Sequence, residues 1–96
     1  GALNIVIYSK FRRKVNMRVI KEIPYANFKI TIFQWNGKYL IKIESGQLEQ
    51  TFKMNELDVT SEEDVLRLLD EPFIEEVMNR FHEMSNSLGA AFERHL

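Results

Sequence analysis

The stretch FKITIFQWNGKYLIKIE, residues 28–44, decides the fold. Two runs rich in β-branched and aromatic residues flank Asn36-Gly37, the dipeptide that best tolerates the two positive φ angles of a type I′ turn. A two-residue loop here fixes which residues face each other. It predicts Trp35–Lys38, Phe33–Leu40, Thr31–Lys42 and Lys29–Glu44 on one face, and Ile32–Ile41 and Ile30–Ile43 on the other.

Similar runs on both sides of this hairpin extend the sheet. Downstream, a turn at Ser45-Gly46 joins residues 38–44 to residues 47–54 and predicts the pairs Ile43–Leu48, Tyr39–Phe52 and Lys42–Glu49. Upstream, a strand over residues 17–23 turns through residues 24–27, where proline fixes φ. It predicts the pairs Ile23–Phe28, Val19–Ile32 and Glu22–Lys29. The sequence therefore predicts a four-stranded antiparallel β-meander over residues 17–54.

After Met54 the apolar spacing changes from two to three and four, which indicates helices. Thr60 and Glu63 have the spacing of a capping box and predict a short helix over residues 61–70. Pro72 suits the first turn of a second helix over residues 72–94, with Asp70 or Glu71 near its cap. The fold class is therefore α+β, with the helices of residues 60–95 packed on one face of the sheet.

The second helix is longer than the sheet that it covers. About 23 helical residues span roughly 35 Å, whereas seven-residue strands span roughly 23 Å. We expect the helix to extend past the sheet over residues 88–96, where Gly89-Ala90-Ala91 would let another helix come close. A second copy of the chain is the simplest cover. The predicted dimer helix comprises Met84, Leu88, Ala91 and Phe92.

The predicted register assigns each strand residue to a face. The apolar face, which takes the helices, comprises Val19, Ile23, Phe28, Ile30, Ile32, Tyr39, Ile41, Ile43, Leu48, Phe52 and Met54. The second face mixes basic and aromatic residues and includes Arg18, Ile20, Lys29, Thr31, Phe33, Trp35, Leu40, Lys42, Thr51 and Lys53.

Two interpretations of the second face stay open. Bases of a single-stranded nucleic acid could stack on Phe33 and Trp35 while the basic residues Arg18, Lys29, Lys42 and Lys53 contact phosphates. Alternatively, a second subunit or residues 3–8 could cover the apolar patch formed by Ile20, Phe33, Trp35 and Leu40. We favour the second interpretation, since the glutamates Glu22, Glu44 and Glu49 weaken the positive potential.

Composition sets further limits. The 96 residues suffice for a single domain, and the absence of cysteine excludes disulfides and fits a cytoplasmic location. The apolar run of residues 3–8 is too short to span a membrane. Residues 1–16 are interpreted as a possible upstream or added segment, because Met17 could be an internal start.

Charge divides the chain into two unlike parts. Residues 1–53 hold ten basic side chains against three carboxylates, and residues 54–96 hold three against eleven. Such asymmetry can mark a nucleic-acid-binding face. It can equally mean that two parts of one fold attract each other, and this second interpretation is favoured.

No residue cluster predicts catalysis, a metal or a cofactor. His82 and His95 are thirteen residues apart. A helix would bring Asn79, His82, Glu83 and Asn86 together, but a solvated helix face explains the same residues. The acidic stretch over residues 62–76 has no calcium-loop spacing. We therefore expect a homodimeric, non-enzymatic interaction or structural module, with single-stranded DNA or RNA binding as the alternative.

The sequence also shows two resemblances to known families. MRVIKEIPYANFKITIFQWNGKYLIKIESGQLEQTF, from residue 17, and TSEEDVLRLLDEPFIEEV, from residue 60, resemble a family of short bacterial conserved proteins, which implies no activity. The order of four strands and a helix is similar to that of the Whirly, PUR-type and transcriptional-coactivator families of single-stranded nucleic-acid binders. That resemblance implies dimerisation through the helix and binding by a basic sheet, and no motif carries over individual residues.

Overall fold

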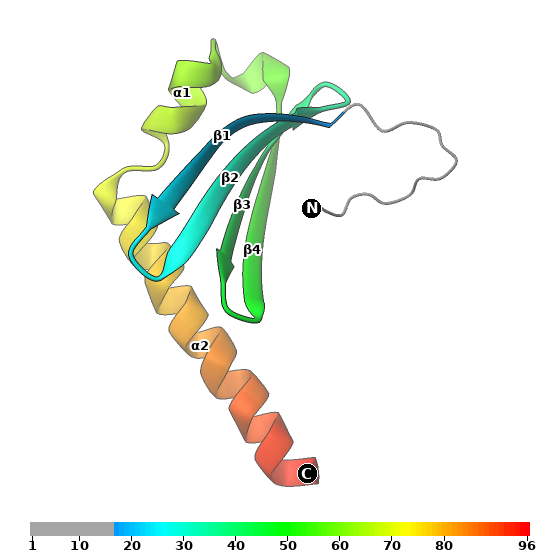
Figure 1. The fold of residues 1–96 in the computed structure, drawn as a ribbon, viewed down its shortest axis with the longest axis vertical. Helices are drawn as coiled ribbons and strands as arrows, with labels where there is room; N and C mark the ends of the chain where they lie inside the picture. The colour runs from blue at the N-terminus through cyan, green and yellow to red at the C-terminus, as the bar shows by residue number, and fades with distance from the viewer. Residues whose placement is uncertain (1–16) are drawn as a thin grey trace.

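The computed structural model describes residues 17–96 and shows an antiparallel sheet followed by helices (Figure 1). The strands are β1 (Arg18–Tyr25), β2 (Phe28–Trp35), β3 (Lys38–Ser45) and β4 (Leu48–Asn55), paired in the order β1-β2-β3-β4. A 3-10 turn, η1 (Glu56–Asp58), precedes the helices α1 (Glu62–Arg67) and α2 (Glu71–His95). The α+β meander prediction is confirmed. The predicted covering role of residues 3–8 lies outside the described residues.

The central hairpin has the predicted register. All six predicted β2–β3 pairs occur, from Trp35–Lys38 at the turn to Lys29–Glu44 at the far end. Asn36 and Gly37 have φ angles of 55° and 73°, the left-handed region that this turn requires. The turn residues therefore determine which side chains of β2 and β3 face the helices.

In both outer hairpins the predicted partners are displaced by two residues. The β1–β2 turn consists of Ala26 and Asn27 alone, so Tyr25 pairs with Phe28. The β3–β4 turn begins at Gly46, whose φ is 60°, so Ser45 pairs with Leu48. Pro24, expected in a turn, lies within β1, where an edge strand tolerates a residue without an N–H group. Because strand side chains alternate with a period of two, this displacement leaves their faces unchanged.

A β-bulge in β1 does change the faces. The register shifts between Val19, which pairs with Phe33, and Lys21, which pairs with Ile32. The extra residue, Ile20, packs against the core, although it was predicted on the second face. Val19 is 49% exposed and pairs on the second face, although it was predicted in the core. One inserted residue moves each β1 side chain that precedes it to the opposite face of the sheet.

The core lies between the sheet and α2. Four isoleucines of the central hairpin, Ile30, Ile32, Ile41 and Ile43, are at most 1% exposed. They belong to one cluster with Val65 of α1 and Ile74, Val77 and Phe81 of α2. The predicted core face is therefore confirmed apart from Val19.

Gln50 is a buried polar residue that connects β4 to α2. Its Nε2 donates to the backbone oxygen of Val77 at 2.9 Å, and its Oε1 accepts from Arg80 at 3.0 Å. It is 8% exposed, so both hydrogen bonds replace solvation that burial removes. The side chain thereby fixes the position of α2 along the sheet.

The helix caps follow the predicted chemistry with one displacement. Asp70 caps α2, as predicted, by accepting from the Phe73 N–H at 3.0 Å. Ser61, rather than Thr60, caps α1 and accepts from the Asp64 N–H at 3.4 Å. The Asp64 carboxylate accepts from the Thr60 N–H at 2.9 Å, and this hydrogen bond lowers the pKa of Asp64, with a further contribution from Arg67.

Replacing Gln50 by Leu should destabilise the protein. Gln50→Leu keeps the side-chain volume close to the original but removes both hydrogen bonds to α2, so we expect a loss of about 1–3 kcal/mol in the free energy of unfolding. Urea unfolding measures this loss. Thr51→Val, on the exposed side of the same strand, is the matched control and should change the free energy by less than about 0.5 kcal/mol. Equal effects of the two variants would contradict the role assigned to Gln50.

Asp64 should make stability depend on pH in the acid range. Its pKa is lowered in the folded protein from 3.8. The ionised carboxylate therefore contributes stability above that value, and the contribution disappears as pH falls through the lower pKa of the folded state. Relative to Asp64→Asn, the unmodified protein should have the higher urea midpoint at neutral pH, and the difference should shrink on acidification. A difference independent of pH would rule out this linkage.

Candidate interaction surfaces

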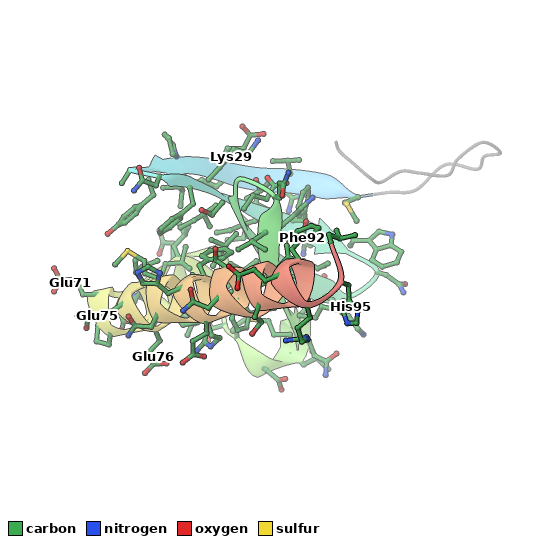
Figure 2. The ribbon with its side chains drawn as sticks, turned by 90° about the horizontal axis from the view of Figure 1, so that it is seen from below. Lys29, Glu71, Glu75, Glu76, Phe92 and His95 are labelled. Atoms are coloured by element: carbon green, nitrogen blue, oxygen red, sulfur yellow. The ribbon has the colours of Figure 1, made fainter. Side chains whose placement is uncertain are left out.

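The C-terminal part of α2 extends past the sheet, as predicted (Figure 1). Met84 still packs against the core, whereas Leu88 is 43% and Phe92 50% exposed. Ala91 is half-buried. Phe92 lies on the side of α2 that faces the strands, and Glu76 lies on the opposite side (Figure 2). The apolar stripe that packs on the sheet thus continues beyond it, and the predicted dimer helix is divided between core and exposed surface.

A groove lies where α2 passes the turns of both outer hairpins. It has a volume of about 610 Å³. Phe28, Leu48, Phe81 and Leu88 contribute apolar walls. The other lining residues, apart from Met78, are uncharged polar side chains and one histidine, namely Asn27, Ser45, Gln47, Asn79, His82 and Ser85.

Sequence reasoning did not find this groove. Asn27, Ser45 and Gln47 come from two turns far apart in the chain, which only the meander brings to the same end of the sheet. Asn79 and His82, considered together from their helical spacing, both line it, whereas Glu83 and Asn86 do not. The one available signal was the repeat along α2, because Met78, His82 and Ser85 follow each other at spacings of four and three.

The outer face of the sheet, the one turned away from α2, carries an apolar row. Val19, Phe33 and Leu40 are neighbours across β1, β2 and β3, and Lys53 of β4 ends the row. Leu40 is 9% exposed, and Phe33 and Trp35 are half-buried. The predicted aromatic residues therefore share a face, but none of the three side chains stands fully in solvent.

The charges of the outer face largely offset one another. Lys42 lies 3.5 Å from Glu44 and 3.9 Å from Glu49. Within residues 17–96, Lys29 and Lys53 form no ion pair. Four of the ten basic side chains of residues 1–53 belong to residues 1–16. The sheet is thus less basic than the sequence suggested.

Arg18 does not belong to the outer face. The bulge at Ile20 reverses its side, and its guanidinium lies 2.8 Å from Glu62 of α1 and hydrogen-bonds to Gln34. Gln34 in turn donates to Glu56 at 2.9 Å. The Arg18–Glu62 contact is the single ion pair between the sheet and the helices among the described residues. Electrostatic attraction between the basic and acidic parts of the chain is therefore local.

Within residues 17–96, no three histidine or acidic side chains come together in a group that could hold a metal ion. In the same range, neither helix has the length and apolarity that crossing a membrane requires. No protein-family model matches the sequence, and comparisons with curated proteins and with solved structures gave no significant match.

Proposed function

We propose that this chain is a non-enzymatic interaction module that forms a homodimer through the exposed C-terminal part of α2. The observation that carries the proposal is the continuity of one apolar stripe. Ile74, Val77 and Phe81 of this stripe are buried against the sheet, whereas Leu88 and Phe92 continue it and are still 43% and 50% exposed. Burying such side chains is favourable by roughly 25 cal/mol per Å².

A second copy of the chain is the simplest partner that could cover this apolar stripe. Twofold association buries the same patch on both subunits, so a single exposed stripe supplies both halves of the interface. An exposed leucine does not by itself indicate an interface, and Leu57 is an example. It is 95% exposed on η1, but it belongs to no buried stripe.

Charged substitutions on the exposed stripe should abolish the dimer without unfolding the chain. Leu88→Glu and Phe92→Glu each place a carboxylate where an apolar contact would be, and we expect association to weaken about 100-fold or more. Sedimentation equilibrium over a range of micromolar concentrations measures this effect, and circular dichroism checks the fold. Leu57→Glu, which exchanges a leucine that is 95% exposed and lies outside the stripe, should leave the dimer intact. A strictly monomeric unmodified protein at high micromolar concentration would refute the proposal.

Binding of single-stranded nucleic acid to the outer face is the second candidate. The alignment of Phe33 and Trp35 with Lys29 and Lys53 on that face favours it. The pairing of Lys42 with two glutamates and the turning of Arg18 toward α1 weigh against it.

Trp35 provides a direct test, because it is the single tryptophan of the chain. If bases stack on this face, a single-stranded oligonucleotide should quench Trp35 fluorescence, and the apparent affinity should fall as salt rises. Lys53→Glu should weaken the response, whereas Glu63→Gln, on α1, should not. Unchanged fluorescence at low salt would exclude binding at this face.

A further inference from the structure

The groove and the exposed end of α2 belong to one repeat along the helix. Six residues recur at alternating spacings of four and three, namely Met78, His82, Ser85, Gly89, Phe92 and Leu96. This is the 3.5-residue period that keeps one face of a helix in contact with another helix. All six are exposed, with Met78 at 46%, Phe92 at 50% and Leu96 at 92%.

The repeat has two unlike halves. Met78, His82 and Ser85 line the groove, whereas Gly89, Phe92 and Leu96 lie further along the helix. The half that lines the groove ends with the small residue Ser85, and the other half begins with the small residue Gly89. No lysine, arginine or carboxylate occurs in the repeat, although Glu83, Glu93 and Arg94 lie on other faces of the same segment.

An antiparallel pair of α2 helices brings the unlike halves together. If Ser85 of one chain lies opposite Gly89 of the other, the same register places Phe92 opposite His82 and Leu96 opposite Met78. Each chain then supplies two large apolar side chains to the partner's groove and receives two in return. The two small residues at the centre allow the helices to come close. Apart from its two chain neighbours and the backbone of its own helix turns, nothing lies within 4 Å of a Cβ added at Gly89, so the space beside it is open.

We infer that the groove is the binding site for the C-terminal end of α2 of a second copy, with Phe92 and Leu96 of each chain filling the groove of the other. This inference rests on the proposed homodimer and specifies its geometry. The chemistry of the groove agrees, because its walls are apolar at Phe28, Leu48 and Phe81 and its lining includes no lysine, arginine, aspartate or glutamate. Such a site suits apolar side chains better than an ionic ligand.

The lengths of the two halves also agree. The groove borders α2 from Met78 to Leu88, eleven residues whose ten steps span roughly 15 Å of helix. The segment from Leu88 to Leu96 is nine residues whose eight steps span roughly 12 Å. The segment from Leu88 to Leu96 of one chain can therefore lie along the part of α2 that borders the groove of the other.

Cysteine cross-linking tests this register, because the unmodified chain has no cysteine. Ser85→Cys and Gly89→Cys are prepared as separate variants, mixed, and oxidised mildly. The proposed pairing brings residue 85 of one chain next to residue 89 of the other, at a Cβ separation near the roughly 4 Å that a disulfide needs. The mixture should therefore form a covalent dimer much faster than either variant alone. Ser87→Cys mixed with Gly89→Cys is the control, because residue 87 lies on the opposite side of the helix.

Gly89→Gln provides an independent measurement. The substitution replaces a poor helix former by a good one in open space, so the helix content should not fall. The new side chain nevertheless occupies the contact between Ser85 and Gly89. Dimer dissociation should become easier by about tenfold or more.

The outcomes separate the two proposals. A monomeric unmodified protein would overturn both the homodimer and this register. A dimer that Leu88→Glu disrupts, but in which the mixture cross-links no faster than the control or Ser85→Cys cross-links with itself, would overturn the register and leave the homodimer standing. Rapid cross-linking of the mixture, together with a weaker Gly89→Gln dimer, is the result that we expect.

Discussion

The pairing of four isoleucines across the central hairpin is the constraint on which the rest of the structure depends. The Asn36-Gly37 turn sets the register, and the register puts Ile30, Ile32, Ile41 and Ile43 on one face. These four side chains are at most 1% exposed in the folded chain. Another apolar surface must therefore cover this face, since removing apolar side chains from water is what favours the folded state. The position and the apolar stripe of α2 follow from this requirement.

The same requirement explains why apolar side chains remain exposed at the end of α2. A helix rises about 1.5 Å per residue and a strand about 3.3 Å. A 25-residue helix nevertheless exceeds the length of the eight-residue strands beneath it. Its apolar stripe packs against the core as far as Met84, Leu88 borders the last turns of the sheet, and Phe92 repeats the pattern further along. The surface is thus a direct consequence of length.

The sequence predicts this fold well where local chemistry is decisive and less well where one residue changes the alternation. Asn-Gly allows essentially one turn, so the β2–β3 register is predictable pair by pair. Nothing local marks Ile20 as a bulge, and this bulge moves Arg18, Val19 and Ile20 to the sides opposite those predicted. The groove is harder still to foresee, because it needs the turns of two separate hairpins beside one helix.

The two apolar surfaces differ in how much favourable contact remains to be made. On the outer face, Leu40 and Thr31 are already 9% and 4% exposed, and Lys42 is engaged by two glutamates. A partner at that face would have to separate ion pairs and would gain little newly buried apolar area. Phe92 of α2 is half exposed, Leu96, which follows α2, is almost fully exposed, and a groove with apolar walls borders the same helix. The end of α2 therefore offers a partner more apolar area to bury than the outer face of the sheet does.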